Sequence, residues 1–345
     1  MDIKKNFSAK LGVIIFFLSF FSLIFSFFLN EDGSGRGASG DFDLTYSFVL
    51  ALQDNIFTDP KDHDLVHTPL HFIILSNISK IVEDPNNLRL LFCIFAIVLP
   101  VFFYKALATN KKDQNLNSLI ILSSCIFFLP AFRYTSIWAN GLITSSIFFI
   151  ISIFFFKKWE LNQSKKIDFN IFLQFIFLVL AVYSRQYFAV FFAYFLYRYF
   201  LKLHLRSFIN LFILCIISSI PVLLYTYYFP ELLSEQHISL DAYSYFLLGN
   251  SSIMSIYIYP IILINLFYKK LFLNIKILKY FLLSILIVFL LSLNFDPIEW
   301  QGGGVNFLIS QKLFNSNIYF YFSSVVTFTF FFYLFFEDKR NIILI

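Results

Sequence analysis

Residues 40–71 read GDFDLTYSFVLALQDNIFTDPKDHDLVHTPLH. This polar interval holds six aspartates and three of the chain's five histidines, whereas the sequence around it is mostly apolar. An apolar run at 11–29 and a glycine-rich link at 32–40 precede it, and apolar runs recur after it to the end of the chain. No other polar stretch is as long, so we expect the chemistry of this protein to lie here, beside a lipid bilayer.

Apolar residues dominate the composition of the 345-residue chain. Hydrophobic residues make up 59% and charged residues 14%, whereas soluble domains carry roughly 25% charged residues. Runs of roughly 17–25 apolar residues, long enough to cross a bilayer, recur from end to end. The fold class we predict is an all-α, polytopic transmembrane helix bundle. Basic residues stand as scattered pairs between apolar runs, which excludes a nucleic-acid-binding surface.

The apolar runs predict about ten spanning helices, with both chain ends in the cytoplasm. They cover residues 11–29, 88–104, 116–132, 139–156, 171–183, 187–201, 208–228, 248–268, 277–294 and 318–336. Residues 70–81 are too few to span the membrane at 1.5 Å per residue and predict a juxtamembrane helix in the first outer loop. Residues 133–138 are expected to form a tight outer turn.

Charge asymmetry fixes the orientation of this topology. Lys and Arg number 19 on the assigned inner side and seven on the outer side, as the positive-inside rule requires. Of the 21 Asp and Glu, 15 lie outside. We predict one domain over 1–345, with outer segments at 30–86, 229–247 and 295–317, in a bacterial inner membrane. No charge falls at mid-span, which argues against an ion-coupled transporter and moves the function to the periplasmic face.

Two motifs in the first part of the chain resemble the GT-C membrane glycosyltransferases. Gly40-Asp41-Phe42-Asp43, just beyond the first apolar run, is similar to their first-loop acidic motif. His67-Thr68-Pro69-Leu70 followed by Asn87-Leu88-Arg89-Leu90 is similar to the His-Pro-Pro-Leu and Arg-Leu-Pro pattern of the lipid A and protein O-mannosyl transferases, with Thr68 in place of the first proline. Ser184-Arg185-Gln186 resembles an Arg-Gln pair of the dolichol-linked glucosyltransferases.

This resemblance implies a glycosyltransferase that takes a sugar from a polyprenyl-phosphate carrier, with inversion at the sugar. The acceptor would be a lipid-linked glycan, a lipid or a protein. Its hydroxyl needs a carboxylate base, for which the motif offers Asp41 or Asp43. The leaving phosphate needs cations rather than a general acid, and Arg suits phosphate best. Outer-side cations expected to bind substrate are Arg89, Arg133, Arg185 and Lys312.

The histidines leave an alternative open. His67 and His71 are four residues apart, a spacing that on a helix would suit a metal, with Asp62 or Asp64 completing the site. An interfacial hydrogen-bonding role in substrate binding fits the same spacing, and we expect no metal and no other cofactor. A flippase or polymerase of lipid-linked oligosaccharides is the alternative function, and a non-enzymatic membrane scaffold is the third. A flippase needs a polar path through its helices, and the predicted spans show none.

Overall fold

The computed structural model describes residues 2–31, 38–55, 58–59, 62, 67–109, 116–162, 164–229, 244, 247–256, 258–259, 275–293 and 305–337. All secondary structure in these residues is helical. The chain divides into two compact units, Met1–Ser234 and Glu235–Ile345. Each unit is described by itself, and the single domain over 1–345 stays a prediction.

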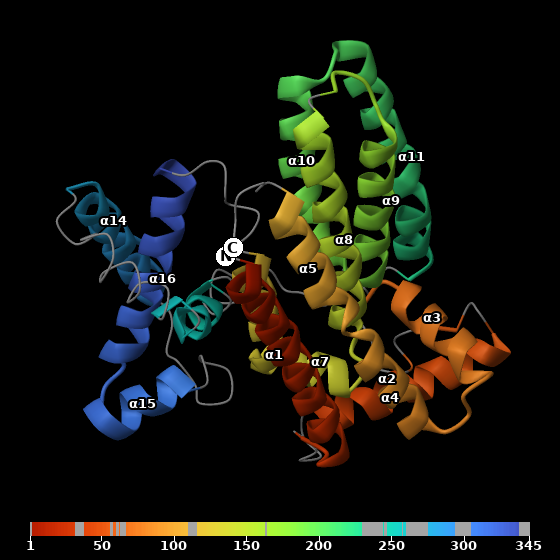
Figure 1. Cartoon of the computed structure of the whole chain (residues 1–345), viewed down its shortest axis with the longest axis horizontal. Helices are drawn as coiled ribbons and strands as arrows, with labels where there is room; N and C mark the ends of the chain where they lie inside the picture. The colour runs from red at the N-terminus through yellow and green to blue at the C-terminus, as the bar shows by residue number, and fades with distance from the viewer. Residues whose placement is uncertain are drawn as a thin grey trace. The chain divides into compact units, whose positions relative to one another are not determined.

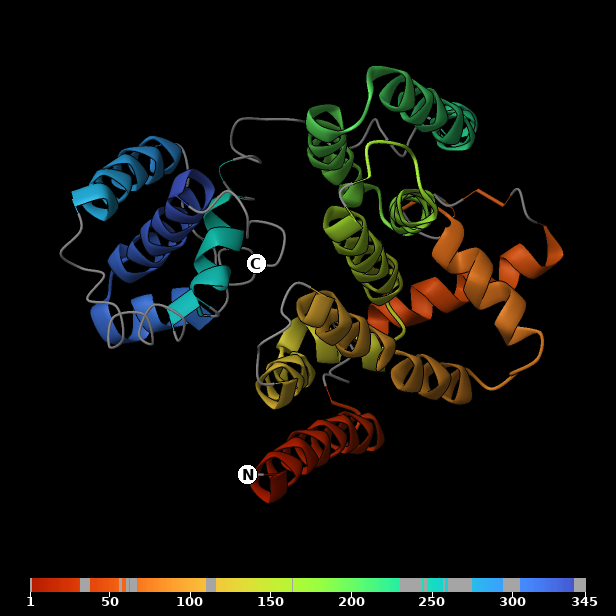
Figure 2. The same ribbon diagram turned by 45° about the horizontal axis from the view of Figure 1, so that its top comes forward.

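The first unit contains eleven α-helices and two short 3₁₀ helices within the described residues, and Figure 1 labels most of these α-helices. Their bounds are α1 Asp2–Phe28, α2 Ala38–Asp54, α3 Leu70–Ser79, α4 Pro85–Phe95, α5 Val98–Thr109, α6 Leu116–Ser124, η2 Cys125–Phe128, α7 Pro130–Ile137, α8 Gly141–Asn162, α9 Phe169–Ser184, η3 Gln186–Ala189, α10 Val190–Lys202 and α11 Leu205–Tyr228. The most extensive helix–helix contacts in this unit are those of α8 with α9 and α5, and those of α1 with α6. Figure 2 shows α8 between α5 and α9.

Several helices of this chain are candidate membrane spans. Four helical segments among the described residues are long and apolar enough to cross a bilayer: Leu11–Phe28, Pro85–Thr109, Gly141–Asn162 and Leu205–Tyr228. A fifth is possible if Leu116–Phe128 and Pro130–Ile137, bent by 65°, count as one span. These candidate spans indicate a multi-pass membrane protein whose secondary structure is all helical in the described residues, and the finer assignment of ten spans stays a prediction. The apolar helices α3 and α9 of this unit are shorter than 18 residues.

Much of the polar interval is helical rather than an open loop. We expected residues 41–54 to belong to a loop, but they lie in α2. The reason is a buried stripe: Phe42, Phe48, Val49 and Leu52 recur at helical spacing and are all buried. Phe48 and Leu52 pack with Phe72 of α3. The helix expected within residues 70–81 is confirmed as α3, which packs against α2, and its juxtamembrane position stays a prediction.

The expected tight turn at 133–138 is wrong in form. Residues 130–137 make α7, a helix that begins at Pro130 after the extended residue Leu129. Proline suits the first position of a helix because its missing N–H would have no partner there. The turn itself comes later, at Trp138 and Ala139, and Asn140 then leads into α8. Because residues 130–137 form a helix rather than a turn, side chains of α7 reach the candidate site.

The second unit is a small helical group. Its described helices are Leu247–Ile256, α14 Ile275–Ser292, α15 Val305–Phe314 and α16 Ile318–Glu337. Small polar side chains bring two of them close: Ser252 and Ser323 hydroxyls lie 2.7 Å apart, and Thr327 donates to the Ser251 carbonyl at 2.7 Å. Such small residues permit close helix packing in membranes. Most of 229–247 and residues 295–304 of the predicted outer loops, with Gly302–Gly304, lie outside the described residues.

Candidate functional site

Asp41 lies in the first turn of α2 and is exposed. The Tyr134 hydroxyl of α7 donates a hydrogen bond to its Oδ2 at 2.8 Å. The neighbouring Phe42 is buried and its ring centroid lies 6.4 Å from that of Trp138, which anchors this end of α2 against α7. One carboxylate oxygen of Asp41 is therefore held by the protein, and the side chain remains open to solvent.

Asn140 connects Tyr134 to the start of α8. Its Nδ2 donates to the Tyr134 hydroxyl at 3.2 Å, and its Oδ1 accepts from the backbone N–H of Leu142 at 3.0 Å. The second bond satisfies an N–H in the first turn of α8 and fixes the amide orientation. Ala139, just before it, is fully buried with φ of 45°. A non-glycine residue there costs about 1–3 kcal/mol, and such strain concentrates at functional sites.

Arg185 completes a chain of hydrogen bonds. It follows α9, and its Nη2 donates to Asn140 Oδ1 at 2.8 Å. Arginine can only donate and an ionised carboxylate can only accept, so every bond in this chain points the same way. The order runs from Arg185 through Asn140 and Tyr134 to Asp41. Residues separated by 144 positions are thereby joined through three hydrogen bonds.

The Arg185 guanidinium is nearly buried, with 9% of the residue exposed. Burial lowers the pKa of Arg185, and the nearby Tyr187, Tyr134 and Asp41 partly oppose this effect. Its Nε is buried and has no hydrogen-bond partner among the residues that the structure describes. A buried N–H without an acceptor is costly, and an anionic oxygen would remove that cost.

His71, the second residue of α3, is the most deeply buried polar group of the site. It is 0% exposed, and its Nδ1 lies 2.9 Å from the Thr144 hydroxyl of α8. Burial and the Arg185 charge lower the pKa of His71 to about 3, although the Ala139 carbonyl opposes them. The imidazole is therefore neutral at physiological pH, and its Nε2 has no hydrogen-bond partner within the described part of the chain.

Gly141 brings His71 and Arg185 together. A Cβ at this position would lie 3.0 Å from Arg185 Nε and 3.2 Å from His71 Cδ2. Both distances are shorter than ordinary van der Waals contact, so any side chain would push one of these groups aside. Glycine at the first residue of α8 thus allows the helix to approach both side chains.

His67 reaches the same region from the segment before α3. Its ring centroid lies 6.0 Å from that of Tyr187, in an edge-to-face arrangement. The next residue, Thr68, is buried and donates to the Val182 carbonyl of α9 at 3.0 Å. This bond joins the segment to the end of α9 that carries Arg185. No group of three metal-ligating side chains occurs among the described residues, and Asp64 lies outside them.

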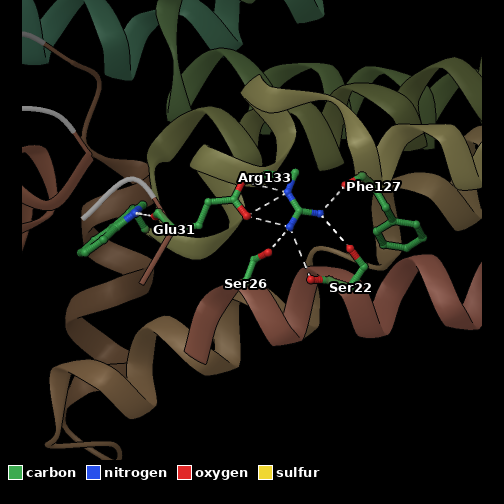
Figure 3. Close-up of polar contacts among 6 residues, drawn as sticks. Ser22, Ser26, Glu31, Phe127 and Arg133 are labelled. Carbon is green, nitrogen blue, oxygen red and sulfur yellow. Dashed lines mark hydrogen bonds and ion pairs between the residues drawn. The ribbon is translucent and has the colours of Figure 1, made fainter. Parts of the chain in front are cut away.

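Arg133 makes structural contacts between α7 and α1 (Figure 3). Its Nη2 and Nε bind the Glu31 carboxylate, with a shortest contact of 2.7 Å. Nη1 donates to the Phe127 carbonyl at 3.0 Å, and Nη2 also donates to the Ser26 hydroxyl. The pKa of Glu31 is lowered, chiefly by its hydrogen bond from Arg133. These contacts occupy the guanidinium, and the phosphate-binding role of Arg133 stays a prediction.

Removing the Glu31 charge tests the structural role of Arg133. We expect Glu31→Gln to lower the free energy of unfolding by about 1 kcal/mol, because Glu31 is 41% exposed and solvent screens the pair. The loss should shrink as pH falls through the lowered pKa of Glu31, where the wild-type carboxylate itself becomes protonated. Thermal unfolding in detergent measures both effects. Glu83→Gln, at an exposed residue between α3 and α4, is the control, and equal effects of the two variants would contradict the assignment.

Arg89 and Asp43 lie beside this contact. The Arg89 guanidinium is 3.5 Å from the Trp138 ring centroid and donates to the Ile137 carbonyl at 3.2 Å. The Arg89 side chain is buried, and these contacts hold it against the end of α7. Asp43 is exposed and interacts with Arg89 through its charge. Neither residue shares a described hydrogen bond with the chain from Arg185 to Asp41.

Lys312 belongs to the second unit. It lies in the last turn of α15 and is exposed. The site described above is built from the first unit alone. The substrate-binding role of Lys312, like those of His67, His71, Arg89 and Arg133, stays a prediction.

Two site residues were not among those predicted from the sequence. Tyr134 and Asn140 occupy the two middle positions of the chain between Arg185 and Asp41. The Asn140-Gly141 pair was the available signal, because Asn before a helix often caps it and Gly permits close approach. Tyr134 carries no such signal, since its role depends on how α7 packs against α2.

Comparisons of this chain with protein-family models, with curated proteins and with solved structures found no match. The candidate site is therefore described by its geometry alone. The exposed Asp41 carboxylate, the neutral His71 and the buried Arg185, whose Nε lacks a partner among the described residues, lie at the ends of α2, α3 and α9, beside the start of α8.

Proposed function

We propose that this protein is a membrane glycosyltransferase of the GT-C type, which transfers a sugar from a polyprenyl-phosphate donor at the outer face of the membrane. The observation that carries the proposal is the hydrogen-bonded chain from Arg185 through Asn140 and Tyr134 to Asp41. It joins a base candidate to a phosphate-binding candidate, and both were expected from the sequence for those roles.

The location of the site supports a lipid-linked donor. Gly141 begins a candidate span of 22 residues, so the site lies at a helix end. A spanning helix ends near the lipid headgroups, which is the depth of the phosphate in a polyprenyl-phosphate sugar. The sugar and the acceptor can then reach the exposed Asp41 from the aqueous side.

The reaction needs one base and one cation. Asp41 takes the proton from the acceptor hydroxyl as its oxygen attacks the anomeric carbon, from the face opposite the phosphate. The bond between that carbon and the phosphate oxygen breaks, and its electron pair stays on the polyprenyl phosphate. Arg185 binds the phosphate as charge develops there, through a guanidinium that Asn140 already holds in place. The sugar is transferred with inversion in this single displacement.

A substrate-dependent assay tests the proposal. The full chain in proteoliposomes is expected to transfer radiolabelled sugar from a polyprenyl phosphate to a lipid or glycan acceptor. Arg185→Lys should lower the rate roughly 10- to 100-fold, because one charged hydrogen bond contributes about 1.5–3 kcal/mol. Lysine keeps the charge but loses the planar fork that binds both Asn140 and phosphate.

Arg206→Lys is the matched control, since Arg206 is exposed near the opposite end of the helix group, at the start of α11. It should keep the wild-type rate. The proposed function would be refuted if the wild-type protein consumed none of a panel of polyprenyl-phosphate sugars. Equal rates for the wild type and Arg185→Lys would refute the role of Arg185 alone.

A further inference from the structure

A second charged cluster lies at the far end of α8. Glu160 follows Gly141 by 19 residues, which is about 28 Å along a helix. This length is close to the roughly 30 Å of a bilayer's hydrocarbon core. The backbone N–H of His204 donates to the Lys165 carbonyl at 3.0 Å, so the α8–α9 and α10–α11 connections meet at this end. If α8 spans the membrane, this cluster lies at headgroup depth on the face opposite the candidate site.

Three cations surround the Glu160 carboxylate. Lys157 Nζ lies 3.0 Å from Oε2, Arg198 Nη2 contacts Oε1, and Lys202 Nζ lies 3.8 Å from Oε1. Lys157 and Glu160 are shielded, whereas the Lys202 side chain is 42% exposed. A further carboxylate at this end of α8 and α9, Asp168, already caps α9 by accepting from the Ile171 N–H at 2.9 Å. Positive charge is therefore in excess.

Helix dipoles do not offset this excess. The carboxyl ends of α8 and α10 meet the amino ends of α9 and α11 here, so their partial charges of about half a unit cancel. Arg198 and Lys202 are also one turn apart on α10, where like charges repel. A bound anion would relieve both effects.

Aromatic groups hold Arg198 and Lys202 in place. Arg198 Nη1 donates to the Tyr194 hydroxyl at 2.8 Å, and Lys202 Nζ lies 5.5 Å from the Trp159 ring centroid. Trp159 itself is fully buried. These contacts restrict the Arg198 and Lys202 side chains to positions beside Glu160.

Apolar side chains next to these cations indicate which anion fits. Tyr197, Phe200 and Leu201 of α10 are each about 60% exposed, on the same helix as Arg198 and Lys202. Free phosphate would contact only the cations. A phospholipid would also cover the apolar surface with its acyl chains, and basic pockets between membrane helices bind such headgroups.

We propose that Arg198 and Lys202 bind the phosphodiester of an anionic glycerophospholipid. Glu160 and the buried Lys157 position Arg198, and the exposed apolar side chains of α10 contact the acyl chains. This site is independent of the proposed sugar transfer, because it lies at the other end of α8 and shares no residue with that site.

Lipid-dependent thermal stability of the full chain in detergent tests the proposal. Phosphatidylglycerol at about tenfold its dissociation constant should raise the melting temperature by roughly 2–4 °C. Phosphatidylcholine, which carries no net charge, should not, nor should inorganic phosphate at the same concentration. An equal shift from phosphate would overturn the lipid assignment in favour of a free anion. An equal shift from phosphatidylcholine would remove the role of charge.

Matched double variants locate the site. Arg198→Gln with Lys202→Gln should abolish the phosphatidylglycerol shift. Lys166→Gln with Arg206→Gln removes the same net charge from exposed residues at the same end and should keep the shift. Lys202→Gln alone, at the more exposed position, should lower lipid affinity about tenfold if the double variant does not fold. Equal loss in both doubles, or a full shift in the first, would overturn the proposal.

Discussion

Asp41→Asn is expected to reduce sugar transfer roughly 10²- to 10⁴-fold, the range over which a positioned general base contributes to catalysis. The substitution keeps the size of the side chain and an oxygen that can accept from the Tyr134 hydroxyl. The folded structure should therefore persist, with an unchanged melting temperature. What disappears is the capacity to take a proton from the acceptor hydroxyl.

Asp43→Asn is the matched control for this result. Asp43 is two residues away on α2 and is also exposed, but it makes no hydrogen bond with the described residues of the chain from Arg185 to Asp41. Its substitution should leave transfer within a fewfold of the wild-type rate. Rates in proteoliposomes at saturating donor separate the two variants. Full activity of Asp41→Asn would remove Asp41 as the base, and loss in Asp43→Asn alone would give that role to Asp43.

The sequence indicated the ends of this site better than its middle. Asp41 and Arg185 stand beside apolar runs in the sequence, and each lies in a short motif that resembles those of the GT-C enzymes. Their separation of 144 residues carries no information on contact. Tyr134 and Asn140, which join them, depend on the direction of α7 after Pro130 and on the turn at Ala139. That turn was expected at 133–138, but residues 130–137 are helical and the turn lies at Trp138 and Ala139.

Helices were predictable where one pattern dominates. The apolar run of α1 and the short segment of α3 needed only length and hydropathy. α2 was expected as loop because its aspartates draw attention, although its buried residues recur at helical spacing. The partner of Arg133 was beyond sequence reasoning for another reason. Glu31 and Ser26 lie more than 100 residues away and meet Arg133 only through the packing of α1 on α7.

His71 is expected to make the stability of this protein depend strongly on pH. Its pKa is about 3 in the folded chain and about 6.5 when exposed. The unfolded state therefore binds the extra proton between these values, and stability falls as pH decreases from 6.5 toward 3. The slope from this one group approaches about 1.4 kcal/mol per pH unit. Melting temperatures in detergent from pH 7.5 to 4.5 measure it.

His71→Asn should flatten this dependence by the same amount. Asparagine places a polar atom near the Nδ1 position that faces Thr144, and it does not titrate. The variant is expected to be less stable at pH 7, since it leaves space beside Phe92, whose ring centroid lies 5.9 Å from that of His71. The change in slope remains readable because it is a difference between pH values. His204→Asn, at an exposed histidine before α11, should keep the wild-type slope.

The slope also bears on the chemistry of the site. A neutral His71 leaves the phosphate charge to be met by Arg185, with the imidazole as a hydrogen-bonding neighbour across Gly141. A protonated His71 would instead add a second cation and repel Arg185. If wild type and His71→Asn show parallel pH curves, the imidazole is protonated or accessible in the folded chain. In that case Arg185→Lys should lower the transfer rate by less than the roughly 10- to 100-fold expected above. The reason is that a protonated His71 would also bind the phosphate.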